Sequence, residues 1–267
     1  MADCSAKPPE TCTATVKLDV AGRSIEMQIT VPGGPTRPAQ LLPLLQSLTD
    51  AVVDIAGDIV AEQGKTISCK AGCGACCRQL VPISQSEARR IAELVDRLPE
   101  PRRAEIRRRF AAAEERLAAA GLLGTLRETK DIGEDALRAL GMDYFRLGVA
   151  CPFLEDESCS IHRDRPLSCR EYLVTSPAEH CRRPAAATID RVSLPVKVSG
   201  ALLRVERGGG AELVPWVALV VAPQWAASHP DGPPGLDGPE LTRQIFQELS
   251  GRGVPPAEGP RGGESGN

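Results

Sequence analysis

Hydrophobic and polar residues alternate over Thr13–Val31, near the start of the chain. The apolar positions are Val16, Leu18, Val20, Ile25, Met27, Ile29 and Val31, with Ala-Gly-Arg between the two runs. Side chains two residues apart lie on the same face of a β-strand, and a short break containing glycine is typical of a turn. The pattern therefore predicts a β-hairpin.

Apolar residues spaced three or four apart come next, and this spacing predicts helices. The first stripe runs through residues 41–59, with Gly64 where a C-terminal cap belongs. Ser84 and Glu87 form a capping box that begins a second helix, and a third helix follows Pro101. Further helices are expected over residues 133–145 and 237–251. The apolar segments 194–205 and 214–227 are ambiguous between helix and strand, and their length and leading prolines favour helix.

These elements predict a mainly α protein with an N-terminal β-hairpin (α+β), whose helices pack around a cysteine-rich, loop-dominated region. Residues 1–12 and 251–267 have little to bury, and we expect both to be disordered tails. Between them we expect a hairpin and long helix over 13–64, a cysteine-cluster domain over 65–183, and a helical extension packed on that domain over 190–250.

Composition narrows the classes of function. The chain has 267 residues, 42% of them hydrophobic, so it can build a core without a metal. A formal net charge of −3 gives no overall attraction for nucleic acid or for an anionic membrane. The most apolar stretch, residues 213–227, contains two prolines and is shorter than the roughly 20 residues of a membrane span. We therefore expect no nucleic-acid or membrane partner.

Five arginines lie between residues 102 and 109, a run that can indicate nucleic-acid binding. Acidic residues are interspersed in the same predicted helix, and no aromatic residues interleave with the run to stack on bases. We interpret the run as a solvated helix face.

Ten residues are cysteines, and eight of them fall into two groups along the chain. The groups are Cys69, Cys73, Cys76 and Cys77, and Cys151, Cys159, Cys169 and Cys181. The first residues have neither an apolar run nor a cleavage-site pattern, so a cytoplasmic location is expected. In a reducing cytosol, clustered cysteines indicate metal ligands or redox groups rather than disulfides.

All eight of these cysteines are predicted metal ligands. Gly72 and Gly74 allow the first loop to curl so that its thiolates reach a common centre. Adjacent cysteines point in different directions, so the set suits either two four-thiolate sites or one cluster with spare cysteines. Cys4 and Cys12 are left out because of their place in the tail and at the hairpin edge, and His162 is a weaker candidate because thiolates already suffice.

The choice of metal depends on the number and kind of donors. Zinc sites usually take four ligands, often with histidine, whereas this chain has three histidines and more thiols than one zinc needs. Iron–sulfur clusters are held by cysteines, commonly in a tight run plus a distant cysteine next to proline, as in Cys151-Pro152. Thiolates suit both metals. An iron–sulfur cluster, of the 4Fe-4S type, is favoured, and zinc stays as the alternative.

The motifs in this region resemble those of a known family, the YkgJ-type cysteine-cluster family, described as a zinc- or iron-chelating domain. They are the loop Cys69 to Cys77, Cys151-Pro-Phe-Leu, Cys159-Ser-Ile-His, Arg165-Pro166 and Cys169-Arg170. The resemblance covers residues 66–181 and implies a bound metal or cluster rather than a reaction. Arg165 and Arg170, inside the shared motifs, are expected to support the cofactor by offsetting thiolate charge and donating hydrogen bonds.

Three functions are compatible with this sequence. An iron–sulfur protein would serve in electron transfer with a redox partner protein, or in an accessory role. A zinc-stapled binding module would carry out no chemistry. The spacing Cys69-x3-Cys73-x2-Cys76 is also that of radical enzymes that use S-adenosylmethionine, and larger proteins similar to this family methylate flagellin lysines. Against that enzyme, the predicted elements lack βα repeats, and Ala75 replaces the usual aromatic residue. Asp156 and Glu157 are interpreted as a solvated turn.

Overall fold

The structure is a computed structural model that describes residues 10–129, 132–183, 188–207 and 216–250. The predicted tail over 251–267 and all but the last three residues of the predicted tail over 1–12 lie outside the described residues.

Strands β1 (Thr11–Val20) and β2 (Arg23–Pro32) form the predicted hairpin. They pair antiparallel from Thr11 opposite Pro32 to Val20 opposite Arg23. The turn residues Ala21 and Gly22 both have positive φ, as a two-residue hairpin turn requires. The hairpin is confirmed, and its first strand begins two residues earlier than the alternation indicates.

Helix α1 (Pro38–Glu62) is the predicted long helix, and it ends in a Schellman motif. The amide of Lys65 donates to the Val60 carbonyl at 3.1 Å and that of Gly64 donates to the Ala61 carbonyl at 2.9 Å. Gly64 has a φ of +71°, which explains the glycine at this position. Before the helix, β3 (Pro35–Thr36) pairs with β8 (Leu236–Asp237), so the two ends of the fold meet there.

The capping box predicted for Ser84 and Glu87 is present at the start of α2 (Gln85–Arg97), where each side chain bonds the other residue's backbone amide. Three more helices follow, α3 (Arg102–Ala119), α4 (Leu123–Arg127) and α5 (Glu134–Arg146). Their apolar faces share one core with β4 (Pro82–Ile83) and its antiparallel partner β7 (Val217–Ala218).

The segment that carries the second cysteine group consists of short elements, as loop-dominated regions do. They are β5 (Leu154–Glu155), β6 (Ser158–Cys159), a 3-10 turn over His162–Asp164, α6 (Leu167–Glu171) and a 3-10 turn over Ala178–Arg182.

The C-terminal part contains α7 (Val198–Arg207), α8 (Ala222–Ser228) and α9 (Gly238–Ser250). The helix predicted over 214–227 is only partly present, because Val217 and Ala218 pair as a strand with Pro82–Ile83 and the helix proper starts at Ala222. Here a tertiary strand pairing decides the conformation of an apolar run that fits both states. The last helix is confirmed, with the Asp237 carboxylate accepting from the Glu240 amide at 2.8 Å.

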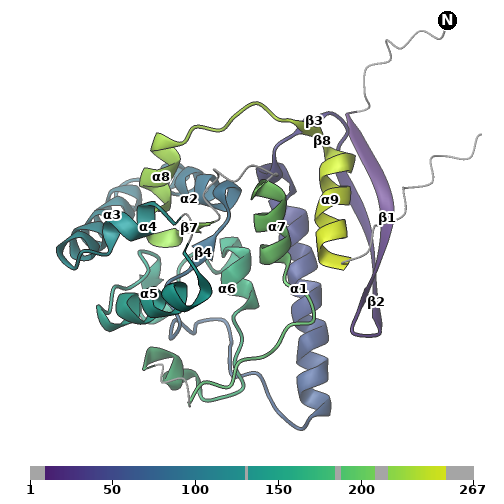
Figure 1. Cartoon of the computed structure of the whole chain (residues 1–267). Helices are drawn as coiled ribbons and strands as arrows, with labels where there is room; N and C mark the ends of the chain where they lie inside the picture. Colours follow the sequence, from purple (N-terminus) through teal and green to yellow (C-terminus); the bar gives the residue numbers. More distant parts are fainter. Residues whose placement is uncertain (1–9, 130–131, 184–187, 208–215, 251–267) are drawn as a thin grey trace, which may run out of the picture.

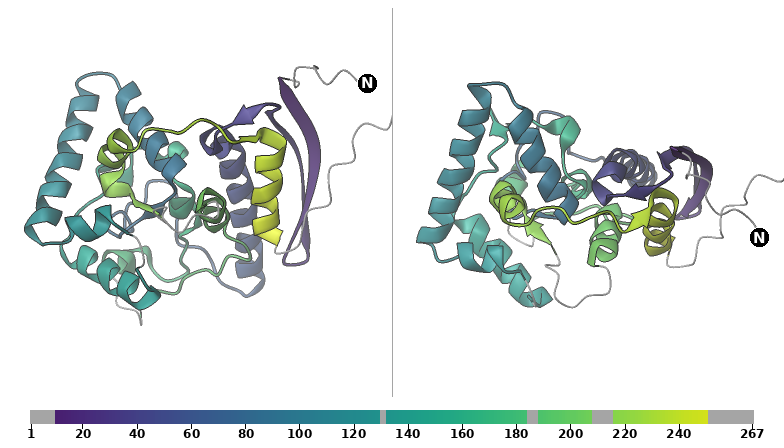
Figure 2. Two further views of the ribbon diagram at one scale, coloured as in Figure 1. Left: turned by 45° about the horizontal axis from the view of Figure 1, so that its top comes forward. Right: turned by 90° about the horizontal axis from the view of Figure 1, so that it is seen from above.

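The described residues form two large hydrophobic cores. The hairpin, α1, α7 and α9 lie together on one side, and α2 to α5 with α8 lie on the other (Figure 1), an arrangement that the views in Figure 2 repeat. Within the C-terminal part, α8 packs on α2, whereas α9 packs on the hairpin and α7. The fold is mainly helical with an N-terminal hairpin, as the sequence predicts.

Among the described residues, no helix combines the length and the apolar character needed to cross a membrane.

Candidate metal centre

The loop Cys69–Cys77 packs directly on the turn between β5 and β6. A Cβ atom placed on Gly74 would lie 2.4 Å from Leu154 Cδ1 and 2.6 Å from the Glu157 carbonyl oxygen. No side chain fits in that space, so only glycine allows the loop to approach this closely. The amide of Cys151 donates to the Cys77 carbonyl at 2.7 Å, which holds the segment around Cys151 against the loop. These contacts bring the two cysteine groups of the sequence together.

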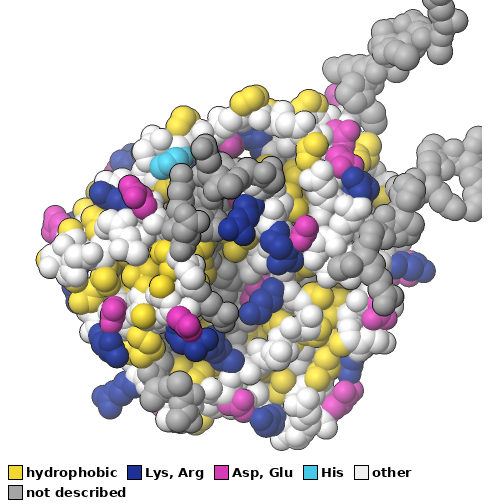
Figure 3. All heavy atoms as spheres, in the orientation of Figure 1, with side chains coloured by type: hydrophobic (Ala, Val, Ile, Leu, Met, Phe, Trp, Pro, Cys, Tyr) yellow, Lys and Arg dark blue, Asp and Glu magenta, His cyan; other side chains and the backbone are white. Residues whose placement is uncertain are grey.

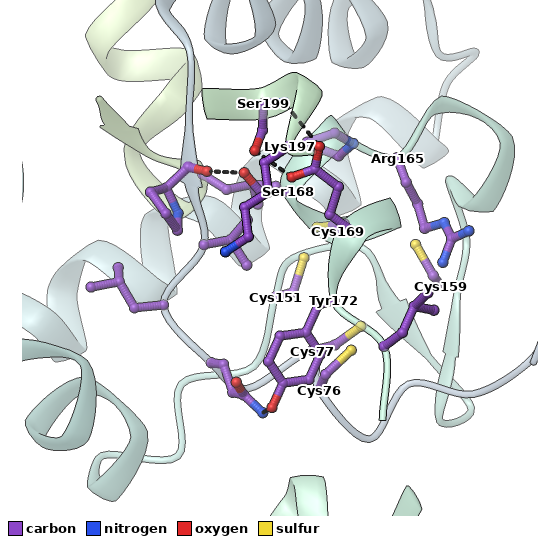
Figure 4. Close-up of a pocket in the computed structure, with 18 of the residues that line it drawn as sticks. Cys76, Cys77, Cys151, Cys159, Arg165, Ser168, Cys169, Tyr172, Lys197 and Ser199 are labelled. Atoms are coloured by element: carbon purple, nitrogen blue, oxygen red, sulfur yellow. Dashed lines mark hydrogen bonds between the residues drawn. The ribbon is translucent and has the colours of Figure 1, made fainter. Parts of the chain in front are cut away.

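Six cysteines line one cavity of about 380 Å³ at this junction. They are Cys73, Cys76, Cys77, Cys151, Cys159 and Cys169. Figure 4 shows the sulfur atoms of Cys76, Cys77, Cys151 and Cys159 directed toward the same space from different segments of the chain. The rest of the lining includes apolar side chains such as Leu80, Val81 and Ile161, so the thiols face a partly dry space.

Cys69 and Cys181 are not among the lining residues, but they pack in one cluster with Cys73 and Cys76, which are. Cys181 is 3% exposed and forms a small cluster with Ala75 and Val174, against which Cys69, Cys73 and Cys76 pack. The start of the loop is tied there by the Ser68 amide, which donates to the Val174 carbonyl at 2.9 Å. The structure thus gathers all eight predicted ligands in one region, and all eight are free thiols.

Burial raises the pKa of several of these thiols. Desolvation, with a smaller contribution from neighbouring thiolates, raises the pKa of Cys151 to about 12 and that of Cys181 to about 11. The pKa of Cys76 is raised first by its hydrogen bond with Cys77 and then by burial. Thiols in this state are neutral near pH 7, and a metal would have to displace their protons on binding.

The donor set fits a thiolate-bound metal. Eight thiols converge in one partly buried region, none is consumed in a disulfide, and Arg165 lies beside them as a cation. In the described part of the chain, no three Cys, His, Asp or Glu side chains already stand in a group that could hold a metal ion. Binding would therefore draw the thiols closer together than they stand now.

The two predicted support arginines have different positions. Arg165 lines the cavity, and its charge lowers the pKa of Cys69, Cys76 and Cys159 against the larger effects that raise it. Arg170 is not among the lining residues. Its guanidinium donates to both oxygens of Asp50 at 2.8 and 3.0 Å and to the carbonyls of Arg163 and Arg165. Arg170 therefore holds the loop that carries Arg165.

Glu157 has a structural role that the sequence did not indicate. Asp156 and Glu157 have φ values of 45° and 59° and form the turn between β5 and β6, as expected. The Glu157 carboxylate, however, pairs with Arg78 at 2.5 Å and with Arg182 at 3.0 Å. Each arginine directly follows a predicted ligand, so this one carboxylate connects three cysteine-bearing segments.

A buried acid, Glu87, positions α6, the helix that contains Cys169. The Glu87 carboxylate accepts the Leu167 amide at 2.7 Å in addition to its bond in the capping box. Desolvation raises its pKa to about 7 although these hydrogen bonds oppose the shift. The capping motif was visible in the sequence, whereas the long-range bond to α6 was not.

The remaining candidates lie elsewhere. Cys12 is in β1 and packs against the core formed by the hairpin and α1, and Cys4 is outside the described residues. His162 is absent from the described cavity lining. The five arginines of the α3 run all pair with acidic side chains, namely Glu100, Glu105, Glu155 and Asp96. That pairing supports the interpretation of the run as a solvated face.

Comparison with known families bears on this region alone. Residues 68–187 match the family model CxxCxxCC, described as a "Putative zinc- or iron-chelating domain". This part of the chain is similar to that family. The resemblance inferred from the motifs is thereby confirmed, and metal binding is the function that it supports. No curated protein and no solved structure matches the chain.

The family domain and the fold do not have the same limits. The CxxCxxCC segment contains α2 to α6 and every predicted ligand, but part of its core is completed by β7 and α8 from beyond residue 187. The hairpin, α1, α7 and α9 form a second core outside it, into which Leu167 of the family domain is inserted. The flanking parts therefore stabilise the position of α6 beside the cysteines.

Proposed function

We propose that the CxxCxxCC segment of this chain binds an iron–sulfur cluster through its grouped cysteines. The protein would serve in electron transfer or as an accessory to a redox enzyme. The observation that carries the proposal is the cavity of about 380 Å³ lined by six cysteines, with two more packed in one cluster with Cys73 and Cys76. The ligands are Cys69, Cys73, Cys76, Cys77, Cys151, Cys159, Cys169 and Cys181.

The kind and number of donors favour iron–sulfur over a single zinc. A structural zinc is complete with four ligands, whereas twice that number of thiols converge here. Zinc sites often include histidine, and no histidine is found among the described lining residues. Iron–sulfur clusters are held by cysteines, and their potentials depend on hydrogen bonds and solvent exposure. A domain in which zinc occupies the thiols is the alternative, and metal analysis separates the two.

The chain's own residues would set the properties of the bound group. A bound cluster would accept and release single electrons. Arg165 offsets part of the negative charge of the thiolates, and the apolar side chains of Leu80 and Ile161 restrict water. Gln79 donates to the Tyr172 hydroxyl at 3.2 Å and to the Cys181 carbonyl at 3.5 Å, which holds the segment around Cys181 in place.

A basic rim would favour an acidic redox partner. Arg191 and Lys197 line the mouth of the cavity, and both residues are exposed. Figure 3 shows several basic side chains close together on the face that carries α7. Charges of one sign around a site speed the association of a partner of opposite sign, and the effect weakens with added salt.

The radical enzyme receives less support from the structure. The strands in the described ranges form four two-stranded antiparallel sheets, whereas radical folds are built on βα repeats. Ala75, where those enzymes usually have an aromatic side chain, is 3% exposed and packs with Val174.

Substitutions of cysteine test the proposal. Cys73→Ser and Cys76→Ser should lower the iron and acid-labile sulfide of protein purified without oxygen. Cys12→Ser is the matched control, because this thiol is also half-buried but packs in the other core. Unchanged iron in the two loop variants, or an equal loss in the control, would contradict the ligand assignment.

A further inference from the structure

The eight thiols divide into two sets according to what surrounds them. Cys69, Cys73 and Cys76 pack with Cys181 around Ala75 and Val174. Cys151 and Cys159 instead pack against the large core of α2 to α5, and Cys169 lies on α6 and lines the cavity with them. The first set is thus held between the loop and the segment around residue 181, and the second between the loop, the β5–β6 hairpin and α6.

The adjacent pair Cys76 and Cys77 lies between the two sets and can supply each with a fourth thiol. Both residues line the cavity; Cys76 also packs in the cluster with Cys181, and the Cys77 carbonyl accepts the Cys151 amide at 2.7 Å. A four-cysteine set satisfies one iron–sulfur cluster or one tetrahedral zinc.

From this arrangement we infer that the domain holds two metal centres that share the wall formed by Cys76 and Cys77. The first centre takes Cys69, Cys73, Cys76 and Cys181, and the second takes Cys77, Cys151, Cys159 and Cys169. This inference deepens the proposed metal-binding function and rests on it, but it does not depend on which metal is bound.

Glu157 lies where it can couple the two centres. Arg78 follows Cys77 of the second set and Arg182 follows Cys181 of the first set, and both pair with this carboxylate. Glu157 itself is two residues from Cys159. The ion pairs of Glu157 therefore connect the segments of the second centre and also hold the segment that carries Cys181 of the first.

The test counts the total metal, iron plus zinc, that each folded chain retains. Cys69→Ser and Cys181→Ser remove ligands of the first centre, and Cys151→Ser and Cys159→Ser remove ligands of the second. Each single variant should retain about half of the wild-type metal. The pair C69S/C181S should retain the same half, because both changes affect one centre, whereas C69S/C159S should retain almost none. Cys12→Ser is the control that should retain all of it.

A single centre gives a different pattern. Substitution of any true ligand would then remove most of the metal, and substitution of a spare cysteine would remove none. The metal content of C69S/C181S would not match that of its two single variants. These results, in variants whose circular dichroism spectra match that of the wild type, would overturn the inference. Two cysteines of each centre are substituted separately, so that the two centres can still be compared if one variant misfolds.

A measurement on the unchanged sequence completes the test. The full chain, stripped of metal and reloaded with zinc alone, should show two zinc ions per chain by native mass spectrometry, and one ion per chain would overturn the inference. Wild-type protein that takes up no metal would instead refute the proposed function, so the two failures are distinguishable.

Discussion

Gly74→Ala tests whether the close approach of the cysteine loop to the β5–β6 turn assembles the site. The added methyl group would lie 2.4 Å from Leu154 Cδ1, 2.6 Å from the Glu157 carbonyl oxygen and 2.8 Å from the Glu157 carbonyl carbon. A leucine methyl can rotate away, but the two backbone atoms belong to a tight turn. The loop and the hairpin must therefore separate by several tenths of an ångström or more.

The size of the effect follows from the cost of overpacking. Forcing an extra methyl group into a packed interior costs about 1–3 kcal/mol. For a chain of this size, that corresponds to a fall of roughly 2–12 °C in Tm. The separation also moves Cys73, Cys76 and Cys77 away from Cys159, so metal retention should fall together with stability.

The assay is thermal unfolding followed by circular dichroism, with and without a chelator, together with the metal content of each variant. Gly141→Ala is the matched control, because Gly141 lies in α5 and an added Cβ there has no neighbour within 4 Å. Alanine is favoured over glycine inside a helix by about 1 kcal/mol, so the control should be stabilised. A Gly74→Ala protein as stable and as metal-rich as the wild type would refute the packing argument.

Three further substitutions have expected outcomes. Arg170→Met should destabilise the fold by about 1.5–3 kcal/mol in chemical denaturation, because it removes charge-assisted hydrogen bonds. Arg170→Lys should not restore these bonds, because lysine lacks the planar guanidinium group. Full recovery of stability in the lysine variant would contradict this. Glu157→Gln should lower the free energy of unfolding by less than about 1 kcal/mol, because partly exposed ion pairs contribute little. It should nevertheless accelerate the loss of metal to a chelator. Unchanged release kinetics would refute the coupling role of Glu157. The pKa of Glu87 is raised from 4.5 to about 7 by burial. Its contribution to stability is therefore greatest below pH 4.5 and is lost as pH rises through 7, and Glu87→Gln should flatten that part of the pH profile of the denaturation midpoint; an equal slope in both proteins would be evidence against it.

Local patterns were sufficient where the chain interacts with its own neighbours in sequence. The alternation over Thr13–Val31 predicted the hairpin, and the pair Ser84 and Glu87 predicted the start of α2. Both depend on contacts within a few residues, which the order of residue types reveals.

Elements decided by distant contacts could not be predicted in the same way. Residues 217–218 adopt a strand because Pro82 and Ile83 offer a pairing partner more than a hundred residues away. Likewise, the sequence allowed for the glycines of the loop but gave no reason for Gly74 in particular, because the backbone that it approaches belongs to Glu157.

The candidate site shows the same limit. The spacing of the cysteines indicated the proposed ligands, because thiolates at such density have few other uses. It did not distinguish Arg165, which lines the cavity, from Arg170, which anchors its loop to Asp50 on α1. It also gave Glu157 no role, since the two arginines that this carboxylate binds come from segments far apart in sequence.

The most direct test of the central claim is the iron, zinc and sulfide content of the full chain purified without oxygen, measured together with its visible spectrum. An iron–sulfur protein should be brown, absorb near 400 nm, contain iron and sulfide in matched amounts, and bleach when reduced. A colourless protein that holds zinc and no sulfide would contradict the iron–sulfur assignment and leave a zinc-binding module in its place.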